Sequence, residues 1–212
     1  MAHPHDHDHD HHDHSHAPAH DHGGPWSEFK YLEAAVRELL IEKGVVTADE
    51  MRREIERMDG RNPENGARVV ARAWVDPAYK ARLLKEGTKA VGELGVTIDP
   101  VHLIVVENTD KVHNVVVCTL CSCYPRNLLG RPPDWYKQRD YRSRAVREPR
   151  QVLKEFGTEL PDDVRVAVHD STADMRYLVL PKRPAGTEKL SEAELAKLVN
   201  RDSMIGVAVP KA

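Results

Sequence analysis

Residues 115–125 read Val-Val-Val-Cys-Thr-Leu-Cys-Ser-Cys-Tyr-Pro. The run of valines is typical of a buried strand, and Cys118, Cys121 and Cys123, which follow it, are the three cysteines of the chain. Because no cysteine is left to link a distant segment, we do not expect a disulfide framework. The strand and the cysteine-rich turn after it therefore form the centre of the predicted fold.

The spacing of the cysteines predicts a metal site. Positions i, i+3 and i+5 let a tight turn direct three sulfurs at one point, and the amide nitrogens of Ser122 and Cys123 face the same centre. Two deprotonated amides and three anionic sulfurs make a strong ligand field, which suits low-spin Co(III) or, second, Fe(III). A sixth position stays open for water or substrate, so such an ion acts as a Lewis acid.

Two other interpretations of the cysteines remain open. Structural zinc needs a fourth protein ligand, and the second cysteine pair of the usual zinc knuckle is absent. His113 could supply a nitrogen, although it falls within a strand and suits the core equally well. Alternatively, three buried thiols share a turn without binding a metal.

The residues before the cysteines predict a helical arm. Apolar residues recur at helical spacing after Ser27, and Thr47 with Glu50 forms a capping-box pattern at the start of a second helix. A third helix is expected around 69–74, and Asp76-Pro77 opens a fourth that continues to about residue 93. The first two helices are too charged to be stable alone, so the arm needs a partner.

Later segments add strands. Short β-branched runs at 103–106 and 115–117 predict buried strands, two more are expected at 164–168 and 176–180, and Ser191 with Glu194 caps a last helix. We therefore predict an α+β fold with three parts. These are a His/Asp-rich tail over 1–25, a helical arm over 26–96 and a layered α-β-β-α domain over 97–212 that carries the metal site.

Composition excludes several classes of function. The formal net charge is −3, without the basic excess that a nucleic-acid-binding protein needs. The sequence has no apolar run of about 18 residues, and its N-terminus carries His and Asp where a signal peptide needs an apolar region, so we expect no such leader. We expect a cytoplasmic protein.

The first 25 residues contain ten of the thirteen histidines, interleaved with aspartates. This composition cannot bury a core, so we expect a disordered tail. Clustered imidazoles and carboxylates bind cobalt, nickel or zinc transiently, and the tail is therefore a candidate for gathering metal. The alternative is a solvated tail, or one added for purification.

Residues 115–125 resemble the signature of nitrile hydratase α subunits and of the equivalent thiocyanate hydrolase γ subunits. The resemblance extends over most of the chain after the tail, through the segments 107–110, 141–144, 147–150, 183–187 and 203–207. It implies that Cys118 is the axial metal ligand and that Cys121, Cys123 and the amides of Ser122 and Cys123 form the equatorial plane. It also implies that Cys121 is oxidised to a sulfinic acid and Cys123 to a sulfenic acid.

The same resemblance implies further roles. Thr119 points to cobalt, since iron enzymes tend to have serine there. Asp170, Asp174 and Arg176 would support the turn from behind the ligands. One or two partner chains, including a β-type subunit, would complete the enzyme and neutralise the oxidised sulfurs with arginine.

Two positions depart from the nitrile hydratase pattern. Asp99 lies about nineteen residues before Cys118, where many members have glutamine, and we assign it no role. Arg126 replaces the tryptophan that typical nitrile hydratases have beside the substrate pocket, which is more like thiocyanate hydrolase. The His/Asp tail and the ending over 205–210 favour the same relative.

Three functions follow in order of preference. The first is the catalytic, metal-binding subunit of a cobalt-type nitrile hydratase, a lyase that hydrates a nitrile to an amide, with Cys123 and Ser122 as catalytic residues. The second is hydrolysis of thiocyanate to carbonyl sulfide and ammonia, and a nucleoside nitrile is a further substrate class. The third is a cobalt-binding or redox-sensing module without turnover, because clustered thiolates oxidise readily.

Overall fold

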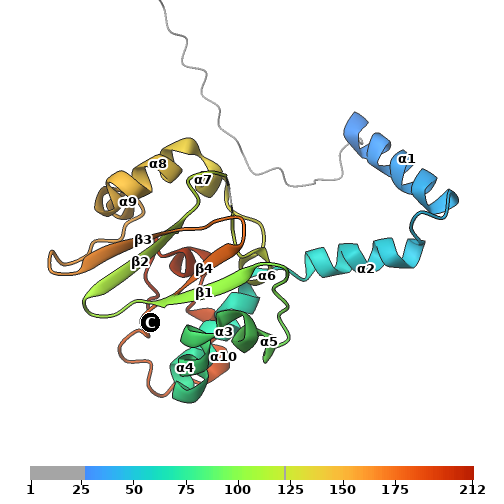
Figure 1. The fold of residues 1–212 in the computed structure, drawn as a ribbon. Coiled ribbons are helices and arrows are strands. Elements are labelled where there is room, and N and C mark those ends of the chain that lie inside the picture. The colour runs from blue at the N-terminus through green and yellow to red at the C-terminus, as the bar shows by residue number, and fades with distance from the viewer. Residues whose placement is uncertain (1–26, 122) are drawn as a thin grey trace, which may run out of the picture. The chain divides into compact units, whose positions relative to one another are not determined.

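The computed structural model describes residues 27–121 and 123–212. The expected tail over 1–25 and Ser122 lie outside the described residues. The fold mixes helices and strands (Figure 1). Its elements are α1 (Glu28–Glu42), α2 (Ala48–Asp59), α3 (Pro63–Val75), α4 (Pro77–Lys85), α5 (Gly87–Gly92), β1 (His102–Glu107), β2 (Val112–Val117), α6 (Arg126–Leu129), α7 (Asp134–Lys137), α8 (Arg139–Arg147), α9 (Pro149–Glu155), β3 (Arg165–Asp170), β4 (Met175–Leu180), α10 (Glu192–Lys197) and α11 (Arg201–Ile205).

The chain divides into two compact units, of which the first ends at Arg52. Its helix α1 has no buried residue, and Phe29 is 81% exposed. The capping box expected at Thr47 is confirmed: the Glu50 backbone nitrogen donates to Thr47 Oγ1 over 3.2 Å, and the Thr47 nitrogen donates to Glu50 Oε2 over 2.8 Å. These bonds satisfy amide donors at the start of α2.

The second unit spans Arg53–Ala212 and contains all four strands of the described residues. The strands form two parallel pairs, β1 with β4 and β2 with β3. In the second pair Val117 lies opposite Asp170, so the end of β2 meets the end of β3. As expected for a buried strand, Val115, Val116 and Val117 are buried.

Helices α3 to α5, which we assigned to the arm, belong to this second unit. Val69 and Val70 of α3 are fully buried in the same apolar cluster as the strands. The single helix expected over 77–93 is also interrupted: Glu86 leaves helical geometry with φ −138° and ψ 62°. A Cβ on the next residue, Gly87, would lie 2.6 Å from the Leu103 carbonyl oxygen, so close packing on β1 accompanies the break.

The C-terminal end of α11 packs on the middle of β2. Gly206 ends α11 in the left-handed conformation (φ 95°), and its carbonyl oxygen lies 2.7 Å from Nε2 of the buried His113. The other ring nitrogen of His113 lies 3.3 Å from Asn108 Nδ2. Since a carbonyl only accepts, Nε2 carries the proton and Nδ1 accepts, so His113 is a neutral core histidine.

Candidate metal centre

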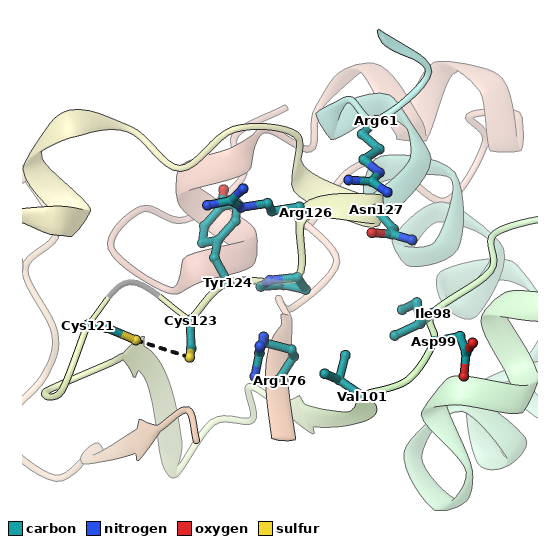
Figure 2. Close-up of a pocket in the computed structure, with 11 residues that line it drawn as sticks. Arg61, Ile98, Asp99, Val101, Cys121, Cys123, Tyr124, Arg126, Asn127 and Arg176 are labelled. Atoms are coloured by element: carbon teal, nitrogen blue, oxygen red, sulfur yellow. Dashed lines mark hydrogen bonds between the residues drawn. The ribbon is translucent and has the colours of Figure 1, made fainter. Parts of the chain in front are cut away.

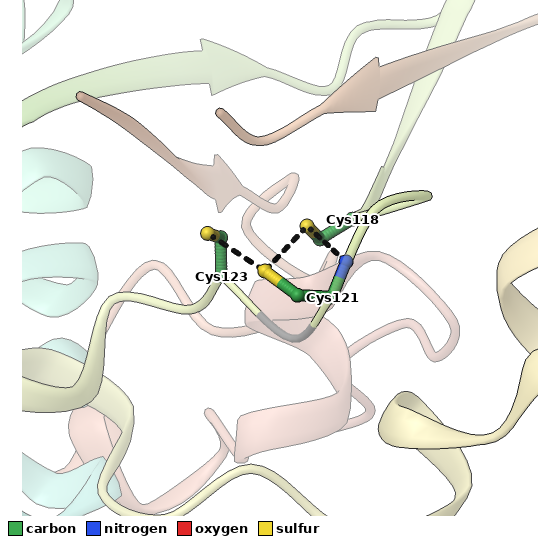
Figure 3. Close-up of side chains that lie close together, drawn as sticks. All are labelled: Cys118, Cys121 and Cys123. Atoms are coloured by element: carbon green, nitrogen blue, oxygen red, sulfur yellow. Dashed lines mark hydrogen bonds between the residues drawn. The ribbon is translucent and has the colours of Figure 1, made fainter. Parts of the chain in front are cut away.

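The three cysteine sulfurs converge at the end of β2 (Figure 3). Sγ of Cys118 lies 3.5 Å from Sγ of Cys121, which lies 3.3 Å from Sγ of Cys123, and all three fall within 4.8 Å of one another. Cys118 is buried, Cys121 is exposed and Cys123 is intermediate. The turn therefore directs three sulfurs at one point that can be reached from outside, as the spacing predicts.

His113 does not join the sulfurs. Its Nε2 faces the Gly206 carbonyl oxygen and its Nδ1 faces the Asn108 amide. Among the described residues, the cluster of potential metal ligands consists of the cysteines alone. A zinc site with His113 as fourth ligand is therefore not formed. Three sulfurs without a fourth side-chain ligand suit an ion that takes its remaining ligands from backbone amides and solvent.

Burial opposes ionisation of the Cys123 thiol when no metal is bound. It raises the pKa of the Cys123 thiol to about 12, and the hydrogen bond with Cys121 acts in the same direction, whereas the charge of Arg176 lowers this pKa. A bound cation deprotonates a coordinating thiol outright. The donor set therefore fits a metal ion. The charge of the ion would stabilise the Cys123 thiolate, which the charge of Arg176 alone does not.

Asp170 fixes the first limb of the turn. Its Oδ1 accepts from the Thr119 backbone nitrogen over 2.9 Å, and its Oδ2 accepts from the Thr119 hydroxyl over 2.5 Å. The register of the β2–β3 pair, with Val117 opposite Asp170, places the carboxylate there. Hydrogen bonds to a carboxylate are charge-assisted and strong, so Asp170 braces the turn.

Arg176 lines the pocket beside the turn, whereas Asp174 does not. Arg176 lines the pocket that Cys121 and Cys123 also line, and its Nη1 donates to the carbonyl oxygens of Ala173 and Met175 over 3.2 and 3.1 Å. Asp174 is exposed, and its backbone oxygen accepts from the His102 nitrogen over 2.7 Å. Among the described residues its carboxylate makes no hydrogen bond or ion pair with the turn.

The pocket beside the sulfurs has a volume of about 360 Å³ (Figure 2). Arg126, the first residue of α6, lines it together with Arg61, Asp99 and Arg176. The sequence placed Arg126 at such a pocket only through the family resemblance, and Asp99 received no role. Charged side chains therefore surround the approach to the sulfurs.

Two residues that we did not predict also contact the turn. The Tyr136 hydroxyl donates to the Cys123 carbonyl oxygen over 2.9 Å. Arg142 Nη1 donates to the carbonyl oxygens of Cys121 and Thr119 over 3.1 and 3.4 Å. Residues 136–147 are basic and include two tyrosines, which marks the stretch as polar. The acceptors of these bonds are backbone carbonyl oxygens, however, and they leave no mark in a sequence.

The family profile described as "Nitrile hydratase, alpha chain" matches residues 27–208. The chain belongs to this family. One relative is the cobalt-containing nitrile hydratase subunit alpha of Pseudonocardia thermophila. It is 53% identical to this chain over 181 residues, covering 84% of this chain and 89% of the relative. The thiocyanate hydrolase subunit gamma of Thiobacillus thioparus is 47% identical over 197 residues, covering 87% of this chain and 81% of that relative.

A solved structure extends the comparison to iron. A double mutant of the Fe-type nitrile hydratase from Comamonas testosteroni Ni1 superposes with a TM-score of 0.77 at 45% identity, covering 87% of this chain and 91% of that one. The resemblance inferred from residues 115–125 is thus confirmed over most of the chain. Both kinds of relative, nitrile hydratase and thiocyanate hydrolase, match it at similar identity.

Proposed function

We propose that this chain is the metal-binding catalytic subunit of a cobalt-type nitrile hydratase, which adds water across a nitrile C≡N bond to give an amide. The observation that carries the proposal is the convergence of three cysteine sulfurs beside a pocket. Cobalt is preferred to iron because cobalt-containing relatives are among the most similar, and Thr119 agrees with that choice.

The proposed ligands are the sulfurs of Cys118, Cys121 and Cys123 with the amide nitrogens of Ser122 and Cys123. A trivalent cobalt ion bound by this set would supply Lewis acidity that polarises the nitrile carbon. Cys121 is proposed to carry a sulfinic and Cys123 a sulfenic acid. One water would supply the oxygen and both protons of the amide by either of two routes. The Cys123 sulfenate would take a proton from the water as it attacks the carbon, or the sulfenate oxygen would attack first and the water would then cleave its bond and restore the sulfenate.

Residues around the turn support this chemistry. Asp170 holds Thr119 by two hydrogen bonds, and Arg176 places a positive charge beside the pocket. We also propose Asp174 as a support, although its carboxylate makes no contact with the described part of the turn. The layered α-β-β-α arrangement and a cytoplasmic location remain predictions. Among the helices of residues 27–121 and 123–212, we find none that combines the length and the apolar character of a membrane span.

We propose that the chain functions in a heteromer with one or two partner chains, including a β-type subunit. Its relatives are named as subunits. Apolar side chains of α1, such as Phe29 and Leu32, are exposed at 81% and 60%, and exposed apolar faces of this kind mark contacts with other chains. Arginines of the partner would offset the charge of the oxidised sulfurs.

Metal analysis and product assays of the purified assembly test the proposal. We expect about one cobalt per chain, no stoichiometric zinc, and amide release from acetonitrile or an aromatic nitrile. Zinc held by sulfur and nitrogen ligands would contradict the metal assignment. Cobalt without release of amide, ammonia or carbonyl sulfide would instead favour a non-catalytic cobalt or redox module.

Arg126 favours a second candidate, hydrolysis of thiocyanate to carbonyl sulfide and ammonia. It lines the pocket with Cys121 and Cys123, and its guanidinium stays charged, so it suits an anion or a polar group better than an alkyl nitrile. Losing a charge-assisted hydrogen bond costs about 1.5–3 kcal/mol, so Arg126→Trp should lower kcat/KM for thiocyanate about ten- to a hundredfold. The same change should improve small apolar nitriles.

The matched control is Arg131→Trp, because Arg131 is exposed and does not line the pocket. Acetonitrile, an aromatic nitrile and thiocyanate are assayed on the assembled enzyme. A crossover of preference in Arg126→Trp, absent from the control, supports a pocket role. Parallel loss on all three substrates would instead assign Arg126 to a subunit contact.

A further inference from the structure

The exposed apex of the cysteine turn has little packing of its own. Leu120 is 85% exposed and Cys121 is exposed, whereas Cys118 at the start of the turn is buried. Asp170 holds the first limb at Thr119. Since burial does not fix the apex, hydrogen bonds position it. One lies within the turn, from the Cys121 nitrogen to Cys118 Sγ over 3.3 Å, and others come from a neighbouring helix.

Arg142 of α8 makes those bonds. Its Nη1 donates to the carbonyl oxygen of Cys121 over 3.1 Å and to that of Thr119 over 3.4 Å. The Cys121 carbonyl belongs to the peptide group that leads toward Cys123, so this bond restrains the backbone between two sulfurs. A guanidinium is planar and permanently charged, and it holds backbone acceptors at a fixed orientation.

Arg142 contacts the turn from outside the substrate pocket. It lines a separate hollow on the surface, with Arg139, Ser143 and Arg147 of the same helix, and is not among the residues that surround the pocket at Cys123. It therefore does not touch a substrate bound there. Its Nε is buried without a hydrogen-bond partner among the described residues, so the contacts with the turn are made through Nη1.

We infer that Arg142 is a positioning residue that fixes the apex of the cysteine turn for metal binding through the Cys121 and Thr119 carbonyl oxygens. The inference rests on the proposed function, in which the turn holds cobalt. Groups that orient metal ligands from behind typically change metal affinity about 10- to 100-fold when they are removed. Arg142 is expected to act on retention of the metal, with little effect on KM.

The test compares three variants of the full chain, each purified as the cobalt-loaded assembly. Arg142→Met keeps an unbranched apolar stem but has no donor, and Arg142→Lys keeps the charge and donors. Arg147→Met is the control, because Arg147 lines the same hollow without a hydrogen bond to the turn. Cobalt loss to excess chelator is followed by elemental analysis, and the cobalt–thiolate absorption band is recorded.

We expect Arg142→Met to lose cobalt about 10- to 100-fold faster than the control and to shift the absorption band, with Arg142→Lys in between. Rates and spectra equal to those of Arg147→Met would overturn the inference. If Arg142→Met does not fold, Arg142→Lys decides, since unchanged retention and spectrum in a variant with altered donor geometry would contradict the positioning role. Failure of the proposed function is distinguishable in the unaltered assembly, which would then contain no cobalt, or would contain cobalt and release no amide from a nitrile.

Discussion

Replacing Gly206 by alanine tests how tightly the end of α11 is joined to β2. Gly206 has a φ of 95°, and a Cβ there would lie 2.0 Å from the Asn114 carbonyl oxygen and 3.1 Å from the Val115 Cα. Both atoms are backbone of β2, which leads to Cys118. The clash can therefore be relieved only by moving α11 or the strand that ends at the sulfurs.

The expected cost has three parts. The left-handed conformation costs about 1–2 kcal/mol for a residue with a Cβ. Overpacking against a buried strand adds about 1–3 kcal/mol. Displacing Gly206 also weakens the buried bond from His113, which adds about 1–3 kcal/mol. We therefore expect the free energy of unfolding to fall by about 3–8 kcal/mol.

The structure provides a matched control in Gly157. Its φ is 79°, and a Cβ there would meet nothing within 4 Å, so Gly157→Ala carries the conformational cost alone. For a chain of this size about 1 kcal/mol corresponds to about 2–4 °C. In thermal unfolding followed by circular dichroism, Gly206→Ala should melt at least about 6 °C lower than the unaltered chain, and Gly157→Ala about 2–8 °C lower. Equal shifts in the two variants would refute the argument from close approach.

Three further predictions concern the metal site, the tail and the core. The intact mass of the active chain should exceed the sequence mass by three oxygens, two on Cys121 and one on Cys123, and full activity of an unoxidised chain would contradict this. Deletion of residues 1–25 should leave turnover of the loaded enzyme unchanged but lower cobalt content when cobalt is scarce; equal content would show that the tail is inert. Burial lowers the pKa of His113, so the unfolded chain binds the proton more readily and stability should fall as pH drops below about 6.5. Denaturant titrations from about pH 7.5 to about pH 5 should show a smaller loss in His113→Gln, and an equal loss would exclude His113 as a source.

Local signals in the sequence predicted the ends of several elements correctly. Ser191 and Glu194 form the expected capping box of α10, and Asp76 caps α4 by accepting from the Tyr79 nitrogen over 2.9 Å. These signals work because donor and acceptor lie three residues apart, so the local sequence contains the whole interaction.

Pairings between distant segments could not be predicted in the same way. The sequence indicated four strands but did not indicate that β1 pairs with β4 and β2 with β3. The break at Glu86 was missed for a similar reason, since the close contact of Gly87 is with Leu103 on another element. Burial of Val69 beside the strands likewise depends on tertiary packing.

In the candidate site, too, the contacts within one turn could be predicted from the sequence and the contacts between distant segments could not. Cysteine spacing alone predicted that Cys118, Cys121 and Cys123 converge, because the three residues share one turn. Asp170 entered through the family resemblance, which did not name its partner, and the structure places its carboxylate against Thr119. Arg142 was missed because its acceptors are carbonyl oxygens, which every residue has.

The parallel pairing of β2 with β3 has a consequence during synthesis of the chain. Thr119 and its brace Asp170 are 51 residues apart, so the cysteine turn leaves the ribosome well before the carboxylate that holds it. Contacts of such long sequence separation form late, because the intervening loop must close first. Until β3 has been made and paired, the three thiols form a nascent turn without the Asp170 brace. For the proposed cobalt site, we therefore expect metal loading to be more selective after the second half of the chain has folded, because only then does Asp170 hold the turn in place.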